Sequence, residues 1–264
     1  MMEVIVAVVV GVLGLVGNER TTQPASPGWH YVQVEGERGP VKGAIYVPRG
    51  VDAPAPAPAL VFLHGYGECG TDGSNHLTVG LPPAVMRAPE RWPFVIVAPQ
   101  KPEHNAEWED FEDAVLAMLD LAVAEFNADA GRVAITGLSQ GGHGTITIAS
   151  RNPGRFVATA PVCGYIERWN TDGAKQRVPT RHDSPAMQAA ARALANHPVW
   201  LFHGGADDVV PALESETLHE ALIGAGNTET KLTIFPRANH NSWDLAYNDT
   251  ELWRWLAQQL DADG

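Results

Sequence analysis

The sequence predicts an α/β fold in which a mostly parallel central sheet carries helices on both faces. Short apolar segments of strand length alternate with longer helical segments from residue 59 onward. Residues 59–63 are apolar at every position, which is typical of a central parallel strand that is buried on both faces. Gly137-Leu138-Ser139-Gln140-Gly141 stands between a β-branched strand segment and the start of a helix, so it predicts a sharp strand-to-helix turn. Gly137 and Gly141 are expected to let the strand and the helix pack closely there.

Length and composition are those of one large domain with a full core. The chain has 264 residues, of which 45% are hydrophobic. Its formal net charge of −13 argues against binding to nucleic acids or to anionic lipid surfaces, both of which need basic patches. The two cysteines, Cys69 and Cys163, form no C-x-x-C pair, so the sequence suggests no cysteine-based zinc site.

The N-terminus carries an apolar run at residues 4–17 that is too short for a comfortable membrane span of about 20 residues. Its length is that of the apolar region of a signal peptide, so residues 1–28 are interpreted as a signal-peptide-like segment and linker, and the protein is expected to be secreted or periplasmic. Glu3 precedes the run without any Lys or Arg, and no clean cleavage site follows it. An uncleaved N-terminal membrane anchor and a misplaced start codon are the alternatives.

Residues 29–264 are expected to form a single catalytic domain that begins with a hairpin. The Pro-rich stretch 52–58 is interpreted as a stiff connector into the first buried strand. Strands are expected, in chain order, at 31–34, 41–47, 59–63, 94–98, 132–136, 158–162, 199–202 and 230–235. Helices are expected from Leu81, at 107–128, 142–150, 184–194, 212–223 and 243–260.

The connection between the sixth and seventh strands, about residues 164–197, is longer than an ordinary strand-to-helix connection. Its first part is polar and contains Trp169, and its second part is helical. We therefore expect this segment to form a small cap.

Three loops supply the residue types of a serine-hydrolase triad. In an open α/β sheet, functional groups gather at the carboxyl ends of the strands. Ser139 follows one strand end, Asp207 and Asp208 follow the strand 199–202, and His240 is the only histidine in the loop after the strand 230–235. The order of serine, acid and histidine is the one in which a base activates the hydroxyl and a carboxylate orients the base.

Acyl transfer also needs hydrogen-bond donors for the negative charge that develops on the carbonyl oxygen. One donor is expected from the backbone N–H of Gln140, the residue after the nucleophile. The other is expected from the backbone N–H of Tyr66, in the glycine-rich loop after the strand 59–63. In that loop, Glu68 is expected to hold the backbone by hydrogen bonds.

Taken together, these motifs resemble the α/β-hydrolase superfamily, and most closely its phospholipase/carboxylesterase branch with the related predicted-peptidase and feruloyl-esterase-like proteins. The resemblance covers about residues 57–258 and places the acid at Asp207. It rests on the loops Leu63-His64-Gly65-x-Gly67-Glu68, Gly137-Leu138-Ser139-Gln140-Gly141-Gly142, His203-Gly204-Gly205-Ala206-Asp207-x-x-Val210-Pro211 and His240-Asn241-Ser242-Trp243-Asp244-x-Ala246-Tyr247. Tyr66 and Cys69 depart from the family pattern, which puts the local shape of the pocket in question but not the backbone donor.

The resemblance implies an α/β-hydrolase fold and a serine carboxylesterase that cleaves small or medium acyl esters without metal or organic cofactor. The expected partner is a small-molecule ester, with no nucleic acid and no membrane beyond an N-terminal anchor. A peptidase of the same fold and a non-catalytic binding protein are the alternatives. Trp108 is similar in placement to a tryptophan that walls the family's active site, so it is a candidate substrate-binding residue; packing at a helix start is the other interpretation.

The two cysteines leave one question open. The strand that carries Ser139 is expected to separate the strands that precede Cys69 and Cys163, at a spacing of about 4.8 Å per strand. That separation is too large for a disulfide between the strand ends, although the loop at Cys69 could lean across. Two unpaired thiols are therefore expected, with a bridge as the alternative.

Overall fold

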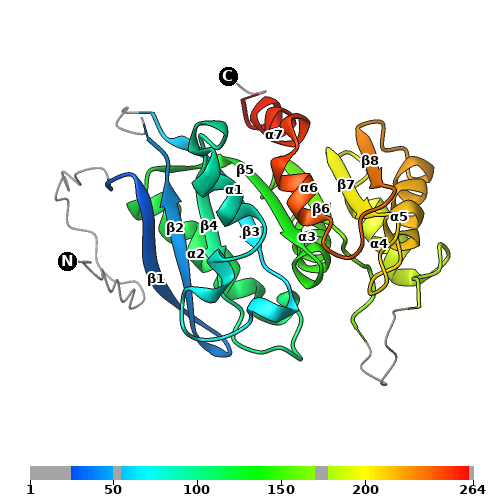
Figure 1. Ribbon diagram of the computed structural model, residues 1–264, viewed down its shortest axis with the longest axis horizontal. Coiled ribbons are helices and arrows are strands. Elements are labelled where there is room, and N and C mark those ends of the chain that lie inside the picture. The colour runs from blue at the N-terminus through cyan, green and yellow to red at the C-terminus, as the bar shows by residue number, and fades with distance from the viewer. Residues whose placement is uncertain (1–24, 50–54, 170–177, 262–264) are drawn as a thin grey trace.

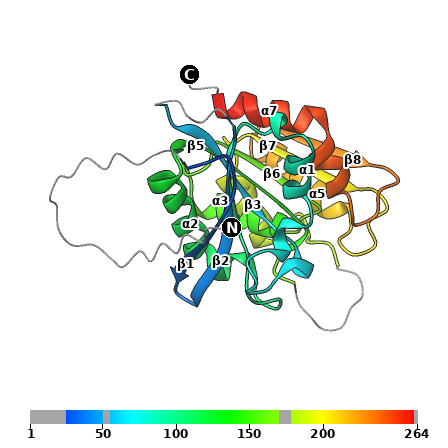
Figure 2. The same ribbon diagram turned by 60° about the vertical axis from the view of Figure 1, so that its left-hand side comes forward.

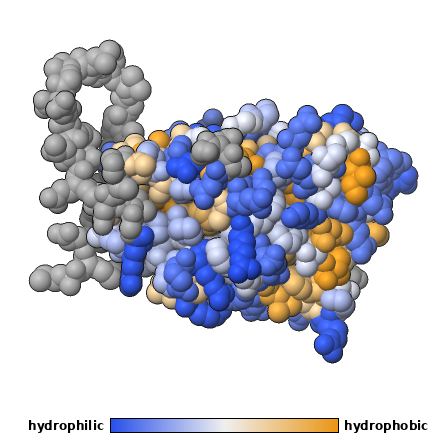
Figure 3. Space-filling model, turned by 90° about the horizontal axis from the view of Figure 1, so that it is seen from above, coloured by the Kyte–Doolittle hydropathy of each residue, from blue (hydrophilic) through white to orange (hydrophobic). Residues whose placement is uncertain are grey.

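The computed structural model describes residues 25–49, 55–169 and 178–261. The apolar run at 4–17 lies outside these residues, and so does most of the N-terminal linker. Among the helices of the described part, none combines the length and the apolar character needed to cross a membrane. On the face shown in Figure 3, hydrophilic side chains predominate and hydrophobic ones gather in smaller patches between them.

Eight strands form one sheet in the order β1-β2-β4-β3-β5-β6-β7-β8 (Figure 1). The strands are β1 Gly28–Gly36, β2 Gly39–Val47, β3 Ala57–Leu63, β4 Val95–Pro99, β5 Ala128–Leu138, β6 Ala158–Val162, β7 Val199–Gly204 and β8 Thr230–Phe235. The hairpin β1–β2 pairs antiparallel to β4 at one edge, and all other neighbours pair in parallel. This confirms the mostly parallel sheet and the N-terminal hairpin that the sequence predicts.

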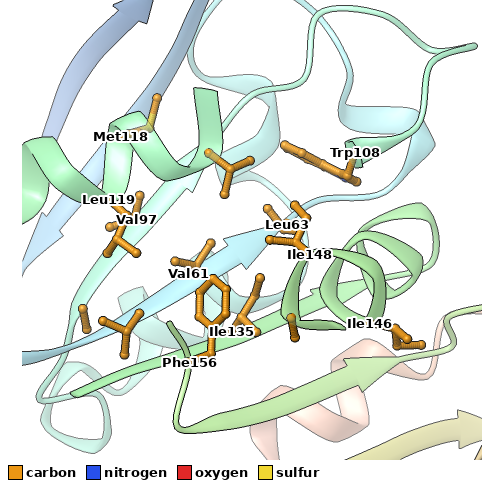
Figure 4. Packing of buried hydrophobic residues seen from close by; sticks show 14 of the residues in the cluster. Val61, Leu63, Val97, Trp108, Met118, Leu119, Ile135, Ile146, Ile148 and Phe156 are labelled. Carbon is orange, nitrogen blue, oxygen red and sulfur yellow. The ribbon is translucent and has the colours of Figure 1, made fainter. Parts of the chain in front are cut away.

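Helices cover both faces of the sheet, and the alternation of side chains along β3 shows why. Val61 and Leu63 point into the core under α2–α5, whereas Leu60 and Phe62 point into the core under α1, α6 and α7. Figures 2 and 4 show the two helical layers and the first of these cores. The helices are α1 Leu81–Arg87, α2 Glu112–Glu125, α3 Gln140–Arg151, α4 Pro185–Ala193, α5 Leu213–Gly224, α6 Trp243–Asn248 and α7 Thr250–Asp261.

Two expected helices are broken in the structure. The segment 107–128 begins with a short 3₁₀ turn, Trp108–Phe111, and α2 ends before Asn127, whose positive φ of 57° turns the chain into β5. The C-terminal helix divides at Asp249, whose extended ψ of 128° separates α6 from α7. Both breaks are single-residue changes of backbone conformation, which hydrophobic periodicity does not register.

The segment that we expected as a cap is divided between two environments. Helix α4 starts at its N-cap residue, Ser184, and buries Met187, Ala190 and Ala191 in the same core as α3. It therefore connects β6 to β7 as an ordinary crossover helix. Residues 170–177 lie outside the described residues; within the described rest of the segment, Tyr165 and Trp169 in its first part line a pocket.

Buried histidines should make the fold sensitive to acid. Burial lowers the pKa of His76 to about 4 and that of His197 to about 4. Between about pH 4 and 6.5 the unfolded chain binds more protons than the folded one, so the free energy of unfolding should fall as pH falls through this window. Each histidine contributes a slope of at most about 1.4 kcal/mol per pH unit.

Urea unfolding at a series of pH values from 4.5 to 7.5 measures that slope. His197→Gln should reduce it, whereas replacement of the exposed His182 by Gln is the matched control and should not. If the free energy of unfolding changed equally steeply with pH in the wild type and in His197→Gln, the lowered pKa of His197 would be contradicted.

Candidate active site

Ser139 lies on the turn between β5 and α3 with a φ of 54°, a strained conformation for a residue with a side chain. The flanking glycines make this turn possible. A Cβ on Gly141 would lie 1.9 Å from the carbonyl oxygen of Leu63, and one on Gly137 would lie 2.4 Å from that of Gly141. The prediction that these two glycines allow the strand and the helix to approach closely is therefore confirmed.

His240, from the loop after β8, bridges the serine and an aspartate. Its Nδ1 lies 2.8 Å from Asp207 Oδ2, and its Nε2 lies 2.9 Å from Ser139 Oγ. Because a carboxylate can only accept, Nδ1 carries the proton and donates to Asp207. Nε2 is then free to accept the hydroxyl proton of Ser139, which is the state that a general base requires. The ring of Trp243 meets the imidazole edge to face at 5.5 Å.

Asp207 is buried in the loop after β7 and is surrounded by donors. Its Oδ1 accepts the backbone N–H groups of Val209 and Val210, both at 2.9 Å, and its Oδ2 accepts from His240. Burial raises the pKa of Asp207, but the hydrogen bonds from His203 and His240 outweigh it and hold the pKa well below its ordinary value. The carboxylate is therefore ionised wherever the imidazole can act as a base. The neighbouring Asp208 is exposed and is not part of this arrangement.

His203, near the end of β7, is a supporting residue that was not predicted from the sequence. Its Nε2 faces the carbonyl of Val210, which can only accept, so Nε2 carries the proton, and in the neutral ring Nδ1 accepts from the Ser215 hydroxyl at 2.7 Å. That Nε2–H donates to the carbonyl of Val210 at 2.9 Å and also faces Asp207 Oδ2 at 3.3 Å. A histidine one residue from the end of an apolar strand was the pattern that could have indicated this role.

The side chains of Glu68 and His64 hold the loop after β3 by hydrogen bonds. Glu68 accepts the backbone N–H of Gly65 at 3.0 Å, which confirms the expected holding role. His64 donates from Nδ1 to the carbonyl of Gly65 at 2.7 Å and accepts the backbone N–H of Lys101 at 2.9 Å. Burial keeps the pKa of His64 well below its ordinary value, so the imidazole is neutral and can accept at Nε2.

The two residues that are expected to supply backbone donors, Tyr66 and Gln140, line the same pocket as Ser139. Tyr66 is the first residue of a 3₁₀ turn, Tyr66–Glu68, and Gln140 is the first residue of α3. First-turn N–H groups have no partner within their own helix, so both are available for a ligand oxygen. Both residues line the pocket beside Ser139.

Trp108 does not have the substrate-binding position that we expected for it. Its side chain is fully buried in the core, where Figure 4 shows it near Leu63, and it does not line the pocket. Its indole Nε1–H donates to the carbonyl of His64 at 3.0 Å. A Cβ on Gly144 would lie 2.5 Å from the Trp108 Cβ, so α3 packs directly on this residue. Trp108 is thus a packing residue that braces the loop after β3.

A pocket of about 520 Å³ lies over Ser139. Its wall includes Tyr165 and Trp169, which follow β6, and Trp243, which follows His240. These three side chains were not assigned to the site from the sequence. His143, on α3, holds Tyr165 in place: the two rings stack at 4.6 Å, and Nδ1 of the histidine donates to the Tyr165 carbonyl at 3.0 Å. His143 therefore supports the wall by packing.

Both cysteines are buried and unpaired. Cys163 has a positive φ of 41° and lies beside the aspartate–histidine pair. Burial and the charge of Asp207 raise the pKa of the Cys163 thiol far above its ordinary value, so it stays protonated.

Two groups in the described part of the chain bring metal-ligating atoms within 4.8 Å of one another: Cys163, Asp207 and His240, and Glu107, Glu109 and His143. In the first group, His240 already donates to Asp207. In the second, Glu107 accepts from Tyr165, and Glu109 lies 3.1 Å from His143. The histidines and carboxylates of both groups therefore already take part in hydrogen bonds with one another or with the pocket wall.

A family model described as the prolyl oligopeptidase family matches residues 102–263, more than half of the chain. No curated protein matches the chain. Among solved structures, a thermostable esterase is 27% identical with a TM-score of 0.69, over 87% of this chain and 62% of its own. The acylaminoacyl peptidase of Pyrococcus horikoshii is 16% identical with a TM-score of 0.64, over 88% of this chain and 42% of its own.

A truncated carbohydrate esterase from gut microbiota is 15% identical with a TM-score of 0.64, over 91% of this chain and 98% of its own. Identities of 16% and 15% show that this chain shares the fold of the peptidase and of the carbohydrate esterase, and no more. This chain thus spans about three fifths of the length of the thermostable esterase, two fifths of the peptidase and nearly all of the carbohydrate esterase.

Proposed function

The chain belongs to the prolyl oligopeptidase family of α/β-hydrolases, and we propose that it is a serine carboxylesterase. The observation that carries the proposal is the hydrogen-bonded chain from Ser139 through His240 to Asp207 at the wall of the pocket. A serine hydroxyl is a weak nucleophile until a positioned base removes its proton. The geometry supplies such a base and a carboxylate that orients it.

In the proposed reaction, Ser139 Oγ attacks the ester carbonyl carbon while His240 Nε2 takes the hydroxyl proton. The backbone N–H groups of Tyr66 and Gln140 donate to the oxyanion that forms. The C–O bond to the alcohol then breaks, and the imidazolium returns its proton to the leaving oxygen. Water, activated by the same histidine, hydrolyses the acyl-enzyme and restores the serine.

One comparison supports our choice of an ester over a peptide substrate. The solved structure with the higher identity, 27%, is an esterase, whereas the acylaminoacyl peptidase is only 16% identical. The family itself contains peptidases by its description, so a peptidase is the second candidate.

A substrate panel separates the two candidates. We expect p-nitrophenyl esters of acetate, butyrate and octanoate to be hydrolysed, and an aminoacyl p-nitroanilide to be turned over at least about 100-fold more slowly in kcat/KM, a difference of about 2.7 kcal/mol in transition-state stabilisation. Both substrate types release a chromophore, so one assay measures both. A faster anilide reaction would instead identify a peptidase.

A further inference from the structure

The pocket over Ser139 has an acidic lining. The described residues that line it include two carboxylates, Glu68 and Glu107, and no lysine or arginine. Glu68 is committed to the backbone of its own loop through the N–H of Gly65. Glu107 is the more deeply buried of the two, and it lies among the aromatic residues of the pocket wall, which makes it the better candidate to act on a charged group in the pocket.

Glu107 is held in place by neutral donors. The Tyr165 hydroxyl lies 3.0 Å from each of its carboxylate oxygens, and the backbone N–H of Trp169 donates to Oε1 at 3.0 Å. The side chain is buried, with the residue only 4% exposed. Within the described parts of the chain it forms no ion pair. Burial of a carboxylate without a cationic partner is costly, and its two oxygens can accept further bonds.

Two described cations that lie near Glu107 are committed elsewhere. Arg168 pairs with Asp110 and lies 3.5 Å from Glu109. The buried Lys101 donates from Nζ to the carbonyl of Ala106 at 2.7 Å. The imidazole of His143 also lies within 4.8 Å of Glu107, and it faces Glu109 at 3.1 Å. None of these three side chains lines the pocket, so among the described residues Glu107 has no direct counter-ion on the pocket side.

Aromatic rings surround the same space. Tyr66, Tyr165, Trp169 and Trp243 all line the pocket, and the rings of Tyr165 and Trp169 meet edge to face at 5.5 Å directly beside Glu107. The faces of such rings attract cations, most strongly where water is excluded. A carboxylate set among aromatic rings is the chemistry that recognises an ammonium group.

We propose that the pocket selects substrates that carry a positive charge, and that Glu107 and the aromatic wall bind a quaternary ammonium or protonated amine on the ester. This inference rests on the proposed esterase function and names the substrate class for it. Glu107 is then a specificity-determining residue: it contacts the cation of the substrate and takes no part in bond breaking. The net charge of −13 acts in the same direction, because it attracts cations toward the protein.

The test compares cationic esters with neutral esters of the same shape. On the alcohol side the pair is acetylthiocholine and 3,3-dimethylbutyl thioacetate, which differ only in a nitrogen or carbon at the centre of the trimethyl group. On the acyl side the pair is the p-nitrophenyl ester of 4-(trimethylammonio)butyrate and that of 5,5-dimethylhexanoate. In at least one pair we expect kcat/KM for the cationic member to exceed that of the neutral member about tenfold, mainly through KM.

Two variants separate charge from shape. Glu107→Gln should bring the cationic-to-neutral ratio close to one, because it removes the charge. Tyr165→Phe is the matched control: it removes the hydroxyl bound to the same carboxylate, so it can loosen the wall, but it leaves the charge and should preserve the ratio. Loss of wall structure alone would slow both members of a pair equally, so the ratio reports the charge.

A wild-type ratio near one in both pairs would overturn the inference, and so would a ratio that survives in Glu107→Gln. The wild-type comparison decides the matter even if that variant fails to fold. Hydrolysis of the neutral members without cation preference rejects this inference while the esterase function stands. Failure to hydrolyse any ester rejects the proposed function and, with it, the inference.

Discussion

Replacement of Ser139 by alanine is expected to lower kcat for ester hydrolysis by about 10⁶-fold, the loss seen when the nucleophile of a comparable triad is removed. The reason lies in the geometry. Ser139 carries the hydroxyl that His240 Nε2 contacts, at 2.9 Å, so its loss leaves the base with no nucleophile to activate. Alanine keeps the Cβ and the strained φ of 54°, so the fold should remain intact.

Covalent labelling by a fluorophosphonate probe, read by intact mass, measures the same change independently of any ester. The wild-type chain should gain one probe adduct, and Ser139→Ala should gain none while its circular dichroism spectrum stays unchanged. If the variant kept most of its esterase activity, or were still labelled, Ser139 would not be the nucleophile.

The second large effect is expected from Asp207→Asn, which should cost about 10⁴-fold in kcat. The new amide would have nearly the same shape as the carboxylate but could present its N–H₂ group to His240. The imidazole would then turn to the tautomer that carries its proton on Nε2, where it can no longer accept the proton of Ser139. The Val209 and Val210 N–H groups, now at 2.9 Å from Oδ1, could still bond to the amide oxygen, so the loop should keep its conformation.

Asp208→Asn is the control for this prediction, because Asp208 is the adjacent residue and its side chain is exposed. Its kcat should stay within about threefold of the wild type, a difference of less than about 1 kcal/mol. Equal losses in the two variants would mean that the effect comes from the loop and not from the bond to His240. A larger loss in Asp208→Asn would place the acid one residue further along the chain.

The architecture, and the loops that carry the candidate triad, could be predicted from the amino-acid sequence alone. Residues 59–63 are apolar throughout, as expected for a strand such as β3 that is buried on both faces. The alternation of strands and helices after it predicts a parallel sheet. Parallel strands end at one edge of the sheet, so residues just beyond the strand ends must be neighbours. That rule, applied to Ser139, Asp207 and His240, needed no knowledge of the helices that pack around them.

The surroundings of these residues became visible only in the folded chain. Trp108 was open to two interpretations because both a packing and a pocket tryptophan can begin a helix; its contact with the His64 carbonyl settles its role in packing. The segment after β6 divided into a pocket wall and the core helix α4, which its composition could not show.

Glu107 is the clearest example of a residue whose surroundings only the folded chain reveals. Its partners, Tyr165 and Trp169, lie 58 and 62 residues further along the chain. Strand and helix patterns follow from the local periodicity of apolar side chains, which the sequence contains in full. A contact between side chains of two loops instead depends on how each loop packs against the finished sheet, and no local pattern encodes that.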